Sequence, residues 1–397
     1  MKILVVTQNF HPEVAAAPIR LKNMVESLQA RGFEVDVLTA MPNYPKGKIF
    51  DGYRGKFKMK EPYGNGTLYR YWIYANNSFN KYKRFIGMMS FATTLRCFGM
   101  KRKTVKSYDV VIVQTPPLPI AYSAVKMFKR KGKAKIVLNV SDLQPLALIQ
   151  AGHMKEGSRY HQMFAKMEKY VYEASDALMG QSEEILEYVN SLHQMPASFL
   201  YRTLQRPEKD VEFVPKSAGK HNKLVYAGLL SKTQNVLSII QNVDFKGRGM
   251  EFHLYGDGNQ REEIEKYCDG EHVFYHGSVP NHVMMQELQK YDASIVPLAS
   301  DRTGAVPSKI YNVVYSGMPV LYLGKITGEA AKLIVRYKVG YVAAPLDFET
   351  LNKNLDKFCS LTEEEYQELV NNCIDLSQKD FSFDKQMERF DEFLRKL

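Results

Sequence analysis

A possible phosphate site lies in residues 303–311, Thr-Gly-Ala-Val-Pro-Ser-Lys-Ile-Tyr. Pro307 and Ser308 are residue types that begin helices, and an apolar run ends shortly before them at Pro297. A helix that starts there directs free backbone N–H groups and the positive end of its dipole to one point, where Lys309 adds a full charge. That point would bind a phosphate. From the spacing alone, an ordinary helix cap with a solvated lysine is an equal alternative.

Several other polar residues follow apolar runs and have both a chemical and a structural interpretation. Asp142 follows an apolar run and precedes a Leu-Gln-Pro turn, so it is either a catalytic carboxylate or the acceptor of an Asx turn. Glu13 and Arg20 either pair as a loop clamp or orient a substrate. Asp257 is expected to be a turn residue. The backbone of its loop could also approach a ligand. Glu329 either caps its helix or contacts a bound ligand.

The sequence gives no indication of a metal site. It contains no Asp-x-Asp motif, and its four cysteines lack the spacing of metal ligands. Scattered cysteines of this kind suit a reducing cytoplasm. We therefore expect no metal and no cofactor.

The elements that must position these residues alternate between strand-like and helix-like segments. In the first half we expect a helix at 18–31 and strands at 3–6, 33–38, 110–113 and 135–139. In the second half we expect helices at 262–268, 282–291, 308–315 and 329–338, and strands at 224–227, 252–255, 273–275, 293–297, 320–323 and 340–342. This alternation predicts two parallel sheets covered by helices, with ligands outside the carboxyl ends of the strands. Residues 41–106 are basic and aromatic, and we expect them to form long loops and one helix.

A chain of 397 residues exceeds the size at which one core usually keeps growing, so two domains are expected. Residues 206–222 combine prolines, a glycine and many charges without an apolar period, which is typical of a linker. We therefore predict a first domain at 1–205, the linker at 206–222, a second domain at 223–380 and a C-terminal helix at 381–397. The N-terminal apolar run is too short for a signal peptide, and no stretch has the roughly 18 apolar residues of a spanning helix.

The net charge of +11 is concentrated in the first half. Residues 1–205 hold 30 Lys and Arg against 15 Asp and Glu, which leaves 24 against 28 for the remainder. Within that half, segment 79–103 combines basic clusters with Phe and Met, the composition of an interfacial helix. We expect it to contact an anionic membrane surface, so that the protein is cytoplasmic and peripheral at the inner face of the plasma membrane. The alternative is a helix packed on its own domain with solvated ends. Nucleic acid is not an expected partner, because no recognition module accompanies the basic residues.

Together, these motifs resemble a known family. Residues 307–311, followed by Ser-Gly-Met-Pro-Val at 316–320, resemble the nucleotide-sugar site of family 4 retaining glycosyltransferases of the GT-B fold. Segments 254–258, 275–279, 292–297 and 328–331 add to this resemblance, and segments 10–13 and 32–39 resemble the acceptor domain. Segments 41–47, 115–118 and 142–145 are similar to the branch that adds acetamido or deoxy sugars in capsule, O-antigen and exopolysaccharide synthesis.

The resemblance implies an α/β GT-B fold, with two doubly wound Rossmann-like domains facing across a cleft and a C-terminal helix packed back on the first domain. It implies that an N-acetylated or deoxy hexose is transferred with retention from a UDP sugar to a lipid-linked saccharide, and that no metal takes part. Donor-binding candidates are Lys232, Gln234, Gly256, Asp257, Val279, Ser308, Lys309, Asn312 and Glu329. Acceptor-binding candidates are Glu13, Arg20, Asn43, Tyr44 and Gln114. Asp142 and Lys309 are the catalytic candidates.

The sequence also departs from the family pattern. The two motif glutamates fall on Gly304 and Asn312, and the diphosphate-binding Arg and Lys fall on Leu229 and Gln234, so that Lys232 and Lys309 are the expected replacements. The family histidine aligns with Gln114, which cannot act as a general base. Because of these losses, a non-catalytic subunit that binds a sugar nucleotide or polysaccharide remains a competing hypothesis, and a sugar-nucleotide epimerase is a third.

Overall fold

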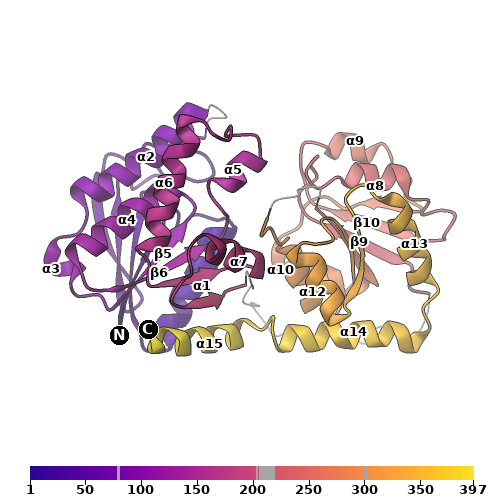
Figure 1. The fold of residues 1–397 in the computed structure, drawn as a ribbon. Helices are drawn as coiled ribbons and strands as arrows, with labels where there is room; N and C mark the ends of the chain where they lie inside the picture. Colours follow the sequence, from indigo (N-terminus) through magenta and orange to yellow (C-terminus); the bar gives the residue numbers. More distant parts are fainter. Residues whose placement is uncertain (78–80, 203, 205–219, 299–302) are drawn as a thin grey trace. The chain divides into compact units, whose positions relative to one another are not determined.

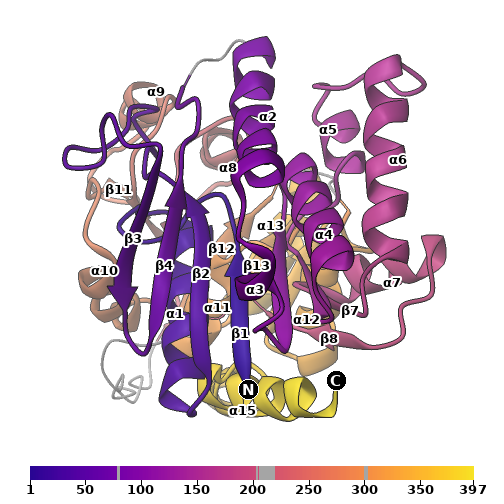
Figure 2. The ribbon, with the colours of Figure 1, turned by 90° about the vertical axis from the view of Figure 1, so that its left-hand side faces the viewer.

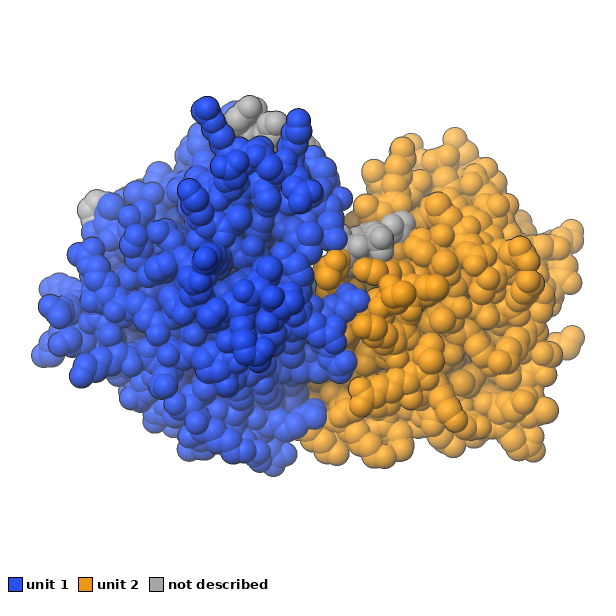
Figure 3. Space-filling view, in the orientation of Figure 1, with its two compact units in different colours: residues 1–202, 386–397 blue, residues 203–385 orange. Residues whose placement is uncertain are grey.

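The computed structural model describes residues 1–77, 81–202, 204, 220–298 and 303–397. It divides into two compact units, unit 1 with residues 1–202 and 386–397 and unit 2 with residues 203–385 (Figures 1 and 3). Of the predicted linker at 206–222, residues 206–219 lie outside the described residues. Among the described residues, no helix is long and apolar enough to cross a membrane.

Unit 1 is built on an eight-stranded sheet in the order β3-β4-β2-β1-β5-β6-β7-β8. All neighbouring strands are parallel except β3 and β4. The central strands are apolar and fully buried, as expected for a parallel sheet with both faces covered. The strands are β1 (Lys2–Val6), β2 (Glu34–Ala40), β3 (Lys58–Tyr63), β4 (Gly66–Tyr71), β5 (Val110–Thr115), β6 (Lys135–Val140), β7 (Ala177–Gly180) and β8 (Ser198–Leu200).

Helices cover this sheet, and three of them, α2, α4 and α6, pack next to one another in that order (Figure 2). Ser158 and Ser182 cap α6 and α7, because each hydroxyl accepts a hydrogen bond from a backbone N–H of the first turn. The helices of unit 1 are α1 (Ala16–Ala30), α2 (Lys81–Phe98), α3 (Arg102–Val105), α4 (Leu118–Lys131), α5 (Leu146–Gln150), α6 (Arg159–Glu173) and α7 (Glu183–Leu192).

Segment 41–106 is more regular than the sequence predicted. It contains the antiparallel hairpin β3–β4, in which Tyr63 pairs with Gly66 across the two-residue turn Gly64-Asn65. Gly64 has a φ of +57°, which matches the left-handed first position of a common hairpin turn. The expectation of loops was wrong for residues 58–71, because the Gly64-Asn65 turn joins two short strands whose mostly polar sequence lacks a clear strand pattern. The one helix expected in this segment is α2, which is followed by the short α3.

The C-terminal helix α15 (Phe383–Lys396) returns to unit 1, as the family resemblance implied (Figure 1). Phe390 packs on Phe199 and Tyr201, with ring centroids 5.1 and 5.7 Å apart. The side chain of buried Gln386 accepts a hydrogen bond from the backbone N–H of Arg202 at 2.7 Å and donates one to its carbonyl at 3.0 Å. The helix is therefore held by an aromatic cluster and a two-point amide contact.

Unit 2 contains a six-stranded, fully parallel sheet in the order β11-β10-β9-β12-β13-β14. Its strands lie almost where the alternation of the sequence placed them: β9 (Lys223–Ala227), β10 (Glu251–Tyr255), β11 (Val273–Tyr275), β12 (Ala293–Pro297), β13 (Val320–Leu323) and β14 (Gly340–Ala343). The helices are α8 (Val236–Asn242), α9 (Arg261–Glu265), α10 (Asn281–Glu287) with the 3-10 turn η1 (Leu288–Lys290), α11 (Lys309–Tyr315), α12 (Glu329–Tyr337), α13 (Phe348–Cys359) and α14 (Glu363–Gln378). Because strand order reverses between β9 and β12, a switch point lies at their carboxyl ends.

The Gln386 contact predicts a measurable stability effect. Gln386→Ala leaves the Arg202 N–H and C=O without their amide partner in a buried position, which should lower the free energy of unfolding by about 1–3 kcal/mol. Urea unfolding measures the loss. Glu388→Ala, at an exposed position of the same helix, is the matched control and should change stability by less than about 0.5 kcal/mol. Equal effects of the two substitutions would contradict the anchoring role of Gln386.

Candidate functional site

A cavity of about 450 Å³ opens in unit 2 at the carboxyl ends of β9 and β10, beside α11 and the switch point. Its size falls in the range of small-molecule sites, and its position is the one at which doubly wound sheets bind ligands. The lining combines apolar side chains with a few polar groups: Ala227, Gly228, Leu229, Tyr255, Gly256, Asp257, Ser278, Val279, Met284, Leu288, Ser294, Ile295, Lys309, Asn312 and Val313.

Lys309, the first residue of α11, is the only lysine or arginine among the described residues of this lining. Its Nζ donates hydrogen bonds to Tyr226 Oη at 2.7 Å and to Gln234 Oε1 at 3.2 Å, and it lies 4.2 Å from the centroid of the Tyr226 ring. Burial lowers the pKa of Lys309 to about 7, because the charged amine loses its hydration. An amine poised in this way can gain a full charge when an anion enters the cavity.

Two glycines allow the loops around Lys309 to come this close. A Cβ at Gly228 would lie 2.2 Å from Lys309 Nζ, and one at Gly256 would lie 1.8 Å from the carbonyl oxygen of Gly228. Their φ angles of +154° and +134° are also unfavourable for residues with side chains. Gly256 was singled out from the sequence as a donor-binding residue, and its observed role is this close approach of the loops after β9 and β10.

Five of the donor-binding candidates line the cavity, namely Gly256, Asp257, Val279, Lys309 and Asn312. Gln234 reaches the site through its hydrogen bond with Lys309. Ser308 and Lys232 are exposed and Glu329 is buried, and none of the three is part of the lining. Lys309 is not the solvated lysine of the alternative interpretation, and the Ser308 side chain makes no cap hydrogen bond.

Sequence reasoning missed Tyr226, which both accepts the Lys309 hydrogen bond and donates one to the Leu229 carbonyl at 2.7 Å. A tyrosine within an apolar strand gives no separate signal, because packing alone would explain it. Sequence reasoning also missed Met284 and Leu288, which form an apolar part of the lining. Their helix was predicted, but its amphipathic pattern does not reveal which face borders a cavity.

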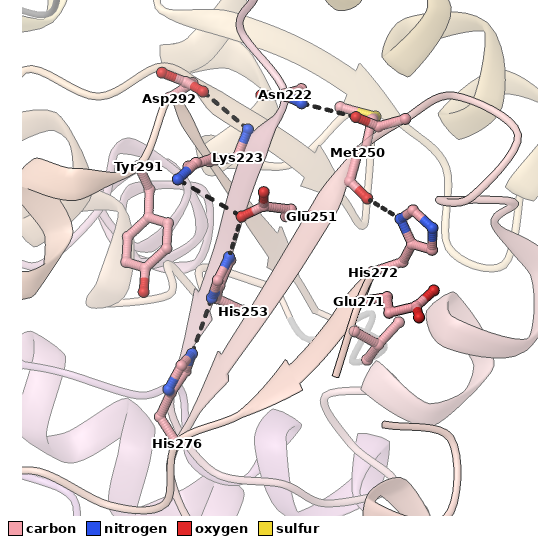
Figure 4. A network of polar contacts seen from close by, with 12 residues as sticks. Asn222, Lys223, Met250, Glu251, His253, Glu271, His272, His276, Tyr291 and Asp292 are labelled. Atoms are coloured by element: carbon pink, nitrogen blue, oxygen red, sulfur yellow. Dashed lines mark hydrogen bonds and ion pairs between the residues drawn. The ribbon is translucent and has the colours of Figure 1, made fainter. Parts of the chain in front are cut away.

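Figure 4 shows a polar network on strands β9 to β11, in which Glu251 contacts Lys223 and His253, and His253 contacts His276. This network borders the lining residue Tyr255 through the His276 ring. The Tyr255 hydroxyl bonds Tyr291 Oη at 2.8 Å and Glu287 at 3.1 Å, and its ring stacks on His276 with centroids 4.6 Å apart. His276 Nε2 lies 2.9 Å from His253 Nδ1, and His253 Nε2 lies 3.0 Å from Glu251. Burial lowers the pKa of both histidines, which favours the neutral rings that can share one proton across this contact.

In unit 1, Glu13 is buried and organises two loops at the carboxyl edge of the sheet. Its carboxylate accepts hydrogen bonds from the backbone N–H groups of Phe10 at 3.0 Å and of Asn43 and Tyr44 at 2.8 Å each, and from the Asn9 amide at 3.0 Å. Burial raises the Glu13 pKa, against the lowering effect of these donors. Glu13 therefore fixes the loop that carries Asn43 and Tyr44.

The remaining candidates of unit 1 differ in exposure. Arg20 is fully buried near Tyr201, and burial lowers its pKa to about 10. Gln114, at the end of β5, is buried, donates to Ser141 Oγ at 2.8 Å and accepts from Asn139 at 2.8 Å. Asp142 is half-buried, and its Oδ1 accepts a hydrogen bond from the next backbone N–H at 3.1 Å.

Gln144 Oε1 accepts a hydrogen bond from the Leu118 N–H at 3.0 Å. This contact joins the loop after β6 to the start of α4, so that segments 115–118 and 142–145 lie together. The described residues hold no group of three or more His, Cys, Asp or Glu side chains that could bind a metal ion.

The comparisons with known proteins agree with this geometry. Residues 17–198 match the model of the glycosyl transferase 4-like domain, and residues 208–375 match that of glycosyl transferases group 1. The two models together span most of the chain, in the order of its two units. The chain is therefore a glycosyltransferase of family 4 with the GT-B fold.

Two curated relatives and one solved structure give this assignment more detail. The chain is 27% identical over 247 residues to the probable glycosyltransferase WbjE of Pseudomonas aeruginosa. The matched region covers 57% of this chain and only 60% of WbjE. It is 24% identical over 342 residues to the putative colanic acid biosynthesis glycosyl transferase WcaI of Escherichia coli K12, covering 80% of this chain and 82% of WcaI. A solved E. coli structure, described as trehalose-6-phosphate bound with UDP-2-fluoro glucose, shares the fold with a TM-score of 0.72 and 11% sequence identity. The match covers 100% of this chain and 99% of the solved chain.

The buried amine predicts a pH-dependent stability difference that needs no ligand. The pKa of Lys309 is about 7 in the folded protein, below its ordinary value of 10.5. Between these two pH values the unfolded chain therefore binds more protons than the folded protein. The stability of the parent protein consequently increases as the pH rises from about 7 to about 10.5. Lys309→Met removes this dependence. We therefore expect the variant to be more stable than the parent at pH 7, with the advantage shrinking toward pH 10 by at most about 1.4 kcal/mol per pH unit.

Urea unfolding of both proteins across this pH range measures the difference. Lys332→Met, at an exposed position of α12, is the matched control and should show no such trend. A pH-independent difference for Lys309→Met would show that the amine is solvated and would contradict its burial.

Proposed function

We propose that this glycosyltransferase moves a sugar, an N-acetylated or deoxy hexose, from UDP to a lipid-linked saccharide during synthesis of a bacterial surface polysaccharide. The observation that carries the proposal is the buried Lys309 amine in a cavity of nucleotide-sugar size at the switch point of unit 2. The role in polysaccharide synthesis is supported by the similarity to WcaI, a putative colanic acid biosynthesis enzyme. The UDP donor is supported by the UDP-2-fluoro glucose of the solved E. coli structure.

In this proposal the diphosphate of the donor lies against Lys309. The cation balances charge as the bond to the anomeric carbon breaks, and Tyr226 and Gln234 hold it in place. The Asn312 amide, also in the lining, hydrogen-bonds the ribose in place of the family's glutamate. A neutral amide oxygen is a weaker acceptor than a carboxylate, so ribose binding depends more on the surrounding backbone.

The proposal includes transfer with retention at the anomeric carbon. Gln114 has no basic group, so the leaving diphosphate itself accepts the proton of the acceptor hydroxyl on the face from which it departs. Lys309 then stabilises the diphosphate, and Asp142 orients the acceptor. In this proposal no metal is required, because Lys309 supplies the positive charge that balances the diphosphate.

A donor assay tests the proposal. Purified protein incubated with a panel of UDP sugars should release UDP slowly to water and faster with a lipid-linked saccharide acceptor. Lys309→Ala should weaken UDP binding by about 1.5–3 kcal/mol, since it removes a charge-assisted hydrogen bond, and should reduce UDP release. Lys332→Ala, which is exposed on α12, is the control and should behave as the parent.

The result also separates the competing hypotheses. UDP binding without hydrolysis or transfer of any donor sugar would favour a non-catalytic binding subunit, and conversion of one UDP sugar to another would favour an epimerase. Unchanged UDP affinity in Lys309→Ala would contradict the site itself.

The membrane part of the proposal concerns α2 and the basic residues that follow it. Lys83, Lys101, Arg102 and Lys103 are exposed, and α2 has no acidic residue in its first turn. Changing these four to Gln should release the protein from anionic phosphatidylglycerol liposomes, because each basic residue near such a surface contributes about 1 kcal/mol.

Liposome sedimentation at low and high salt measures this release, since the attraction is screened within roughly 10 Å at 0.1 M salt. The matched control changes four exposed lysines of unit 2, Lys246, Lys266, Lys332 and Lys353, to Gln and should leave pelleting unchanged. Equal pelleting of the parent and the unit 1 variant would contradict membrane association through this segment.

A further inference from the structure

An apolar trough lies on unit 1, formed by the ends of the β3–β4 hairpin and by α2. It encloses about 380 Å³ and is lined by Phe57, Trp72, Phe85, Ile86, Met89, Ser90, Thr93 and Thr94. Three of these side chains remain markedly exposed, Phe57 by 45%, Trp72 by 40% and Ile86 by 52%. Large apolar groups gathered on a surface in this way are typical of a binding site.

The hairpin wall of the trough is ordered by the strand pairing. Phe57 precedes β3 and Trp72 follows β4, and the Trp72 N–H donates to the Phe57 carbonyl at 2.9 Å. The two rings stack with centroids 6.4 Å apart and planes 14° apart. The pair therefore forms a fixed aromatic wall rather than two independent side chains.

The helix wall comes from a second apolar face of α2. Phe91 and Leu95 on one face are buried in the core, and α2 packs on α4. Ile86, Met89 and Thr93 recur at spacings of three and four residues, so they share another face, which lines the trough. A helix exposed to water on that side would ordinarily be polar there, so this composition indicates an apolar ligand.

The surroundings of the trough are strongly basic. Residues 62–108 contain nine Lys and Arg and no Asp or Glu. Lys56 and Lys58 flank Phe57, Lys83 lies two residues before Phe85, and all three lysines are exposed. An apolar channel with a cationic rim is complementary to an amphiphile that has a hydrocarbon chain and an anionic head.

The trough also lies near the carboxyl ends of the strands of the unit 1 sheet, the edge at which such sheets usually bind ligands. Trp72 directly follows β4, and the Tyr71 carbonyl accepts a hydrogen bond from Met41 N–H at 2.8 Å, at the start of the loop that carries Asn43 and Tyr44. Glu13 fixes the same loop. A ligand head held at this carboxyl edge could therefore extend its chain into the trough.

We propose that the trough binds the hydrocarbon chain of a lipid-phosphate acceptor, so that unit 1 recognises the lipid carrier as well as the saccharide. This inference rests on the proposed transfer to a lipid-linked acceptor. It adds a chain-binding site that is distinct from attraction to a charged membrane surface, because it makes affinity depend on chain length.

The chain contains a single tryptophan, Trp72, which therefore reports directly on the trough. Titration with farnesyl phosphate should shift Trp72 emission to the blue as the ring leaves water. Farnesyl phosphate should bind at least about tenfold more tightly than the shorter geranyl phosphate, since added methylenes are buried. Inorganic phosphate, which has no chain, should leave the emission unchanged.

Substitutions in the helix wall sharpen the test. Ile86→Asp and Met89→Asp should each weaken farnesyl phosphate binding by at least about tenfold. Leu192→Asp is the matched control, because Leu192 is an exposed apolar residue of the same unit outside the trough, and it should bind as the parent. UDP binding, followed by thermal shift, should be retained in all three variants, and a urea unfolding transition of unit 1 like that of the parent shows that the substituted unit is folded.

Several results would overturn the inference. These are equal affinity for the geranyl and farnesyl compounds, unchanged binding in both trough variants, or a Trp72 shift that appears with rising protein concentration alone, which would assign the trough to a second copy of the chain. An equal shift with phosphatidylglycerol vesicles and no response to farnesyl phosphate would assign it to the bulk membrane. Loss of UDP binding by the parent would instead contradict the proposed function.

Discussion

The site in unit 2 depends on one desolvated cation. Lys309 is held between the Tyr226 hydroxyl and the Gln234 amide, and burial brings its pKa to about 7. The amine can lie there because the loops after β9 and β10 meet backbone to backbone at two glycines. An anion in the adjacent cavity would replace the lost hydration of the ammonium group, so the arrangement favours a ligand with concentrated negative charge.

The fold was largely predictable, and the site was predictable only in part. The strands of unit 2 are continuous apolar runs between turn signals, so their positions follow from the sequence. The β3–β4 hairpin was missed because its residues are mostly polar and only its Gly-Asn turn marks it. Lys309 and Asn312 could be placed by motif, whereas Tyr226 could not, because its hydroxyl meets Lys309 only in the folded protein.

The departures from the family pattern share a physical consequence. The family's Arg and Lys fall on Leu229 and Gln234, of which Leu229 is 57% exposed and Gln234 bonds Lys309. Among the described residues that line the cavity, the positive charge available to a diphosphate is that of Lys309. In unit 1 the buried amide of Gln114, bonded to Ser141 and Asn139, replaces the histidine with a fixed polar contact. With both changes, we expect positioning and charge stabilisation to contribute more to catalysis than proton transfer by a side chain.

The central claim is that the unit 2 cavity binds a nucleoside diphosphate against Lys309. Amide hydrogen exchange with and without saturating UDP tests it most directly, because bound ligand slows the local openings that expose the amides. The account predicts slower exchange in residues 227–230, 255–258 and 309–313, which surround the cavity, and unchanged exchange in the strands of unit 1. Slower exchange confined to unit 1, or no change at saturating UDP, would contradict it.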